Sequence, residues 1–390
     1  MTIQLSTERN IMALALAFTI GTACGLATSG TGIPISLRYL SAGISSIAAI
    51  AMTTWTKFAV SQCKLLLTYL AAGIFCATTC QLSSTGVQAM RTSTSAADFG
   101  SMIMSLPFRS DDAAALVNAL VTGDKSWLSP EIVGTFRTSG ASHILALSGL
   151  HLGIIYIILG YATSILGRSP VAKTTRSIII VSLSGAYTIV TGTAPSLVRA
   201  FLFILINETA HLLHRKSNPV HTFCAALMIQ MAVNPSVLES AGFQLSYLAM
   251  AGIITLFPKM KAWYPEPGKE ATRSFIARCP KKVWDAAALT LACQIFTGPL
   301  AWLRFGTFPM HFLLTNILAM PLTTVLMTLA VPSVLLAAAG HCPTFLISAT
   351  GRVAEALIYV MEVIAGMYRR EGCRLFEGYD HRASITLPPP

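Results

Sequence analysis

Long apolar runs separated by short polar segments fill most of this 390-residue chain. An apolar run of about 18 residues or more can cross the roughly 30 Å hydrocarbon core of a bilayer as one helix. The runs predict ten membrane helices, at residues 11–28, 40–56, 62–80, 141–166, 177–192, 196–214, 219–234, 241–257, 285–303 and 310–340. Pro321 and Pro332 lie within the last run, which predicts either one kinked helix or two. We therefore predict an all-α, polytopic transmembrane helical bundle.

Two segments carry amphipathic patterns that predict interfacial helices instead. In the first segment, Ser110 is a candidate cap for a helix that stops at Gly123, and Ser129 caps a second helix with Pro130 at its first position. The second segment, 347–367, contains charges that would be costly on a lipid-exposed helix. The predicted parts are a three-helix membrane segment at 1–80, an outer-face segment at 81–140, a channel bundle at 141–340, an amphipathic helix at 341–377 and a disordered tail at 378–390.

Composition and charge support the membrane assignment. The chain is 54% hydrophobic and 11% charged, whereas soluble domains contain about 25% charged residues. Lys and Arg exceed Asp and Glu by 27 to 16, and the basic residues gather in alternate loops, with seven of them in 258–284. By the positive-inside rule, these loops and the N-terminus are predicted to be cytoplasmic. The net charge of +11 is then mainly a topology signal and only weak support for a nucleic-acid partner.

Four sequence blocks carry the functional information. They are TGDKSWLSPEIVGTFRTSGASHILALSGLHLG from Thr122, PSLVRAFLFILI from Pro195, NPSVLESAGFQLSYLAMAGI from Asn234 and FPMHFLLTNILAMPL from Phe308. In content and order the blocks resemble the ComEC family of DNA-uptake channels over about 110 to 335. The first block contains the family's GD-x-S-x-L-S-P turn and its His-x-Leu-Ala-x-Ser-Gly-Leu-His motif, and the second contains its arginine-bearing helix.

The resemblance implies a channel in the bacterial inner membrane that imports single-stranded DNA during natural transformation, and not an enzyme. Its expected partners are single-stranded DNA, membrane lipids, a periplasmic DNA-binding protein and a cytoplasmic DNA-handling or motor protein. Family members often carry a nuclease domain with an HxHxDH metal motif. This sequence contains no such motif, and its nine cysteines are scattered singly, so it resembles a minimal form with the competence domain only, and we predict no metal and no cofactor.

A strand that carries one charge per nucleotide needs a polar path, because exposure of a charge to hydrocarbon costs at least about 2.5 kcal/mol. Breaks in the helices are expected at Ser148–Gly149 and between Gly192 and Pro195, next to the motifs. The histidines are either DNA contacts or satisfied buried side chains, and Arg199 either holds a phosphate or extends to the interface. The candidate residues of the path are His143, Ser148, Gly149, His151, Arg199, Asn234, Gln244, Ser246 and Asn316.

Two other functions remain open on the sequence. Ser148 and His151 are three residues apart, which suits an intramembrane hydrolase, but the motif contains no carboxylate to orient a catalytic histidine. A secondary transporter of a small anion is the other alternative, although the chain shows no clear internal repeat. Glu208 and His211, three apart on one predicted helix, are expected to pair with each other.

Overall fold

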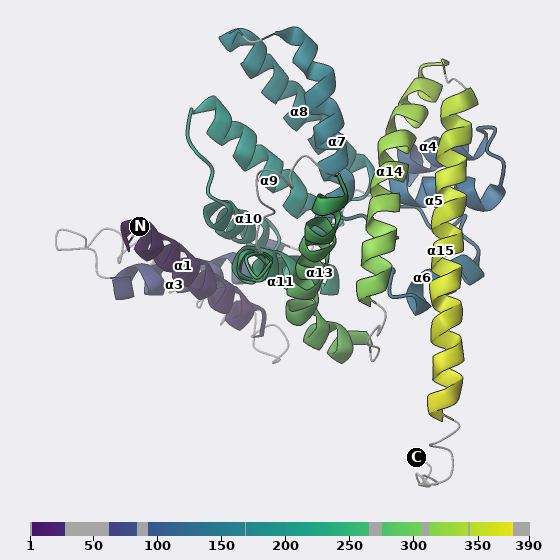
Figure 1. Cartoon of the computed structure of the whole chain (residues 1–390). Helices are drawn as coiled ribbons and strands as arrows, with labels where there is room; N and C mark the ends of the chain where they lie inside the picture. Colours follow the sequence, from purple (N-terminus) through teal and green to yellow (C-terminus); the bar gives the residue numbers. More distant parts are fainter. Residues whose placement is uncertain are drawn as a thin grey trace. The chain divides into compact units, whose positions relative to one another are not determined.

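The computed structural model describes residues 2–27, 62–83, 93–167, 169–264, 275–305, 312–341 and 344–376. Every regular element within these ranges is helical (Figure 1). The α-helices are α1 Thr2–Ala27, α3 Gln62–Ser83, α4 Ser93–Met104, α5 Asp111–Thr122, α6 Pro130–Thr138, α7 Gly149–Ala162, α8 Pro170–Val190, α9 Pro195–Leu212, α10 Pro219–Val233, α11 Ala241–Thr255, α12 Phe257–Lys261, α13 Phe275–Phe305, α14 Phe312–Ala338 and α15 Thr344–Phe376. Two 3₁₀ helices follow α7 and α10, η1 Thr163–Leu166 and η2 Pro235–Glu239.

Each predicted membrane helix within the described ranges has a counterpart, whereas the predicted helix 40–56 and the tail 378–390 lie outside them. The helix predicted over 141–166 is wrong in its first turns, because α7 begins only at Gly149 and turns occupy 141–148. The run 310–340 forms the single helix α14 with both prolines inside it.

Five helices of the described part are long and apolar enough to cross a membrane, in the windows Asn10–Ala27, Gly149–Leu166, Pro280–Phe305, Phe312–Ala338 and Thr344–Met367. Large apolar side chains are exposed on several helices, including Ile165 at 89% and Tyr161 at 77%. Such surfaces are costly in water and suit contact with lipid. The chain is thus built as a helical membrane protein, but ten spans are not confirmed.

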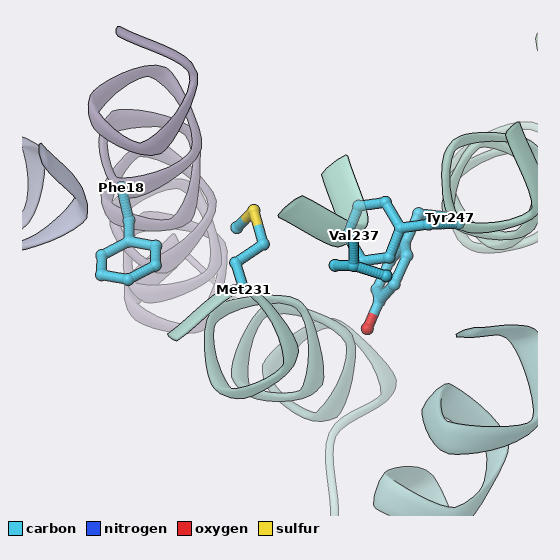
Figure 2. Close-up of a cluster of buried hydrophobic side chains, with 5 residues drawn as sticks. Phe18, Met231, Val237 and Tyr247 are labelled. Carbon is cyan, nitrogen blue, oxygen red and sulfur yellow. The ribbon is translucent and has the colours of Figure 1, made fainter. Parts of the chain in front are cut away.

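The chain divides into two compact units, and the first comprises the described residues of 1–93, 155–263 and 292–304. Within it, α1 and α3 pack side by side (Figure 1). Glycines permit this approach, because a Cβ at Gly21 or Gly73 would overlap the main chain of the other helix. Figure 2 shows part of the adjoining core, in which Phe18 of α1 lies near Met231 of α10, with Val237 and Tyr247 beyond it.

The second unit comprises the described residues of 94–154, 264–291 and 305–390. Here α14 and α15 run side by side, and α15 also packs on α5 and α6 (Figure 1). The Thr315 hydroxyl of α14 donates to the Ser139 carbonyl, 2.7 Å away, and so anchors the end of α6.

The helix predicted after Ser110 is present, but the prediction that it lies at the membrane interface is wrong. The bounds of α5 fit, since Gly123 adopts a left-handed conformation with φ 83° and ends the helix. Every residue from Ala113 to Thr122 is buried, however, so α5 has no free face to lie on a membrane. Ser110 makes no side-chain cap, whereas Ser129 caps α6 as predicted by accepting from the Ile132 N–H.

Candidate functional site

The predicted path residues fall into both units. His143, Ser148, Gly149, His151 and Asn316 belong to the second unit, and Arg199, Asn234, Gln244 and Ser246 belong to the first. Within the units, the structure brings together Ser148 with His151, and Arg199 with Ser246.

Ser148 and His151 together cap the start of α7. The Ser148 hydroxyl accepts from the Leu150 N–H at 3.3 Å, and His151 Nδ1 accepts from the Ser148 N–H at 3.1 Å. This reciprocal pairing resembles a capping box, with histidine in the position where Glu or Gln usually returns the bond. Gly149 is the first residue of the helix, so the predicted break at Ser148–Gly149 is confirmed. His143 lies in the preceding turns and is exposed, so it does not share a helix face with His151.

The same contacts bear on whether Ser148 and His151 could act as the nucleophile and base of a hydrolase. The Ser148 hydroxyl lies 3.0 Å from His151 Nδ1, within reach for a nucleophile and its base. A main-chain N–H can only donate, so Nδ1 is the acceptor and the neutral ring carries its proton on Nε2. His151 is 1% exposed, and its Nε2 has no hydrogen-bond partner among the described residues. The third group that orients a catalytic histidine is therefore missing from this part of the chain.

Replacement of Ser148 separates capping from catalysis. Asn caps helices about as well as Ser, whereas Ala at a cap costs about 0.5–2 kcal/mol. We expect Ser148→Asn to keep the wild-type thermal midpoint and activity, and Ser148→Ala to lower the midpoint. A Ser148→Asn protein that folds normally but loses all activity would show that the Ser148 hydroxyl does more than cap α7, as a nucleophile would.

Arg199 lies on α9 with only 9% of its surface exposed, so it does not extend to an interface. Its Nη1 donates to the Ser246 carbonyl of α11, and its guanidinium carbon lies 5.8 Å from the centre of the Tyr247 ring. No carboxylate of the described residues forms an ion pair with Arg199. Within the described part of the chain, Nη1 supplies the one recorded hydrogen bond of a guanidinium that has five N–H donors.

The turn before α9 adopts the predicted break. Gly192 and Thr193 have positive φ values of 88° and 52°, and Pro195 opens the helix. The N–H groups of Leu197 and Val198 both donate to the Ala194 carbonyl, at 2.9 and 3.0 Å. These two main-chain donors are thus engaged, and the positive group next to the break is the Arg199 side chain.

Of the remaining predicted residues, Asn234 and Gln244 have local partners. Asn234 ends α10 and accepts from the Ser236 hydroxyl at 2.6 Å. Gln244 Nε2 donates to the Leu238 carbonyl at 2.7 Å and so ties α11 to η2. Asn316 of α14 has a buried Oδ1 with no hydrogen-bond partner among the described residues.

Two buried polar groups of the first unit have partners that the sequence did not predict. Glu208 accepts from the Tyr156 hydroxyl at 2.8 Å and the Ser177 hydroxyl at 2.6 Å, whereas His211 is exposed. The expected pairing of Glu208 with His211 is therefore wrong. Gln230, inside the apolar run of α10, bonds the Pro195 carbonyl and the Tyr247 hydroxyl. A lone amide in such a run is a readable signal of a buried contact.

Comparison with known proteins identifies the family. Residues 120–371 match the family described as competence protein, which covers more than half of the chain and all nine predicted path residues. The chain belongs to the ComEC family of competence proteins. It is 30% identical over 153 residues to ComE operon protein 3 of Bacillus subtilis (strain 168), a match that spans 38% of this chain and 19% of that protein. No solved structure matches the chain.

The family assignment supports a role in competence. The matched region begins just before the Gly123 turn and continues through α7, α9, α11 and α14 into α15. It therefore contains both the capped start of α7 and the Arg199 cluster, which consists of Arg199, Ser246 and Tyr247.

Proposed function

We propose that this chain forms a multi-pass channel in the bacterial inner membrane that passes single-stranded DNA into the cytoplasm during natural transformation. Membership of the ComEC family is the observation that carries this proposal. The apolar helices support a membrane location, and the basic loops favour a cytoplasmic N-terminus. No catalytic step by this chain is part of the proposal.

The buried Arg199 supports the proposal, because its positive charge could bind a phosphate group. A cation in an apolar environment is costly unless an anion or hydrogen bonds compensate it. Arg199 has a carbonyl and a ring face but no carboxylate partner within the described residues. A phosphate of the strand would supply the missing negative charge.

Deletion of the gene in a naturally competent host tests this function. We expect transformation by linear DNA to be abolished, while duplex DNA capture at the cell surface stays normal. The same strain should accept DNA by electroporation at the wild-type frequency, which controls for recombination and viability. Normal natural transformation in the deletion strain would exclude the proposed role.

Transport of a small anion is the second candidate, because the Arg199 cluster would attract inorganic anions as well. The two functions differ in the size of the transported molecule. Proteoliposomes containing the full chain separate them: a DNA channel takes up a labelled single-stranded oligonucleotide, whereas an anion transporter takes up phosphate or sulfate and excludes the oligonucleotide.

A further inference from the structure

In the first unit, the buried Gln230 side chain links the start of α9 to Tyr247, whose ring lies near the Arg199 guanidinium. Gln230 Nε2 donates to the Pro195 carbonyl at 3.0 Å, and Gln230 Oε1 accepts from the Tyr247 hydroxyl at 3.0 Å. Because a carbonyl requires a donor, these two bonds fix which end of the Gln230 amide faces each partner. Gln230 and Tyr247 are only 5% and 6% exposed.

The network formed by Gln230 and Tyr247 contacts both the helical turn that precedes Arg199 and the surroundings of its guanidinium group. Pro195 is one helical turn before Arg199, and a helical side chain leans toward the N-terminal end of its helix. The Gln230 amide thus fixes the turn over which Arg199 extends. Tyr247 supplies the ring 5.8 Å from the guanidinium carbon, and the next carbonyl back, that of Ser246, accepts from Nη1.

Packing immobilises the Tyr247 ring. Its centre lies 4.5 Å from that of Phe243 and 5.6 Å from that of Phe223, at interplanar angles of 46° and 65°. Its hydroxyl, bound to Gln230, is buried and does not face a transported molecule. Tyr247 therefore does not offer its hydroxyl to a strand, although it lies in a block that carries candidate path residues. Figure 2 shows the ring beside Val237 in the core cluster.

We propose that Gln230 and Tyr247 are positioning residues that orient Arg199 to bind one phosphodiester group of a single-stranded nucleic acid. The ring and the Ser246 carbonyl fix the plane of the guanidinium, and the donors that remain hold the phosphate oxygens in a fixed fork. This inference rests on the proposed function. It predicts that loss of Gln230 weakens binding through Arg199, although Gln230 itself never contacts the ligand.

The test measures the binding of a fluorescent oligothymidylate to the purified full chain in nanodiscs at several salt concentrations. Each phosphate neutralised on a single strand contributes about −0.7 to the slope of log K against log salt. We expect Arg199→Met to lower affinity about 10- to 100-fold, as for loss of a charge-assisted bond, and to reduce the slope by about 0.7. Gln230→Leu should lower affinity by about 10-fold and also reduce the slope.

A double-mutant cycle distinguishes positioning from a merely structural role. If Gln230 acts through Arg199, Arg199→Met with Gln230→Leu binds no more weakly than Arg199→Met alone. Additive losses, or a Gln230→Leu protein with the wild-type salt slope, would overturn the inference. Gln294→Leu on α13 is the matched control, since Gln294 is half-buried and outside the network, and it should bind as wild type.

Two further outcomes separate this inference from the proposed function. If the wild-type chain shows no salt-dependent oligonucleotide binding, the proposed function fails together with the inference. If wild type binds but Arg199→Met keeps the full affinity and slope, only the inference fails. Should Gln230→Leu unfold, Tyr247→Phe replaces it, because this change removes the hydroxyl and keeps the ring, and a smaller affinity loss in the same direction is expected.

Discussion

Arg199→Met is expected to reduce natural transformation by about 10- to 100-fold or more while the protein still folds. A hydrogen bond to a charged group is worth about 1.5–3 kcal/mol, and about 1.4 kcal/mol is a factor of ten. Methionine retains much of the apolar stem volume, so no large cavity opens in the buried site. Transformation frequency and the amount of protein in the membrane, measured in the same strains, give the result.

Folding should tolerate this change because Arg199 is a buried cation without a carboxylate partner in the described structure. Replacement of such a charge by an apolar group of similar volume is often neutral or stabilising. The thermal midpoint of Arg199→Met is thus expected to equal or exceed that of wild type. If the variant disappears from the membrane, Arg199 serves mainly to tie α9 to α11. If it transforms normally, Arg199 does not contact the strand.

Arg199→Lys tests geometry apart from charge. Lysine keeps the positive charge but lacks the planar fork that holds two phosphate oxygens at once. With bidentate binding, Arg199→Lys should resemble Arg199→Met, and with attraction alone it should retain most activity. Arg352→Met provides the matched control, because Arg352 is an exposed arginine of α15, and it should transform like wild type.

Sequence reasoning succeeded where local chemistry determines structure. Pro195 and Pro219 open α9 and α10 at their first positions, and Gly123 ends α5, all within a residue or so of the predicted bounds. It failed at 141–148, where a largely apolar stretch was predicted as helix but forms turns. The cap made by Ser148 and His151 starts the helix later than hydrophobicity alone predicts.

Contacts between distant residues were beyond the sequence. The Glu208 carboxylate meets hydroxyls that are 52 and 31 positions away, at Tyr156 and Ser177. The sequence pattern favoured His211 as the partner of Glu208, because the two residues are three apart on one helix. The packing of the helices instead brings distant hydroxyl groups to the carboxylate. The burial of α5 was missed for the same reason, since its enclosure depends on α14 and α15, which lie about two hundred positions later.

The helix pair α1 and α3 carries the largest expected effect on folding. Gly21 and Gly25 are spaced four apart on α1, a pattern that lets membrane helices approach closely. A Cβ at Gly21 would overlap the Leu70 carbonyl, and a Cβ at Gly25 would lie 2.7 Å from that of Ala77. Opposite them, a Cβ at Gly73 would overlap the Phe18 carbonyl. The helix backbones are therefore in direct contact, without side chains that could move aside.

Gly21→Leu is accordingly expected to separate α1 from α3 and to lower the amount of folded protein severely. Overpacking in a well-packed interior typically costs about 1–3 kcal/mol, and the obstacle here is main chain that cannot rotate away. Because a folded domain is stable by only about 5–15 kcal/mol, the core around Phe18 should loosen as well. Gly21→Ala should give a smaller loss in the same direction. Gly366→Leu on α15 is the control, since nothing lies within 4 Å of its Cβ position. Membrane protein level and thermal midpoint measure the effect, and a Gly21→Leu protein as stable as Gly366→Leu would show that the two helices do not meet at this glycine.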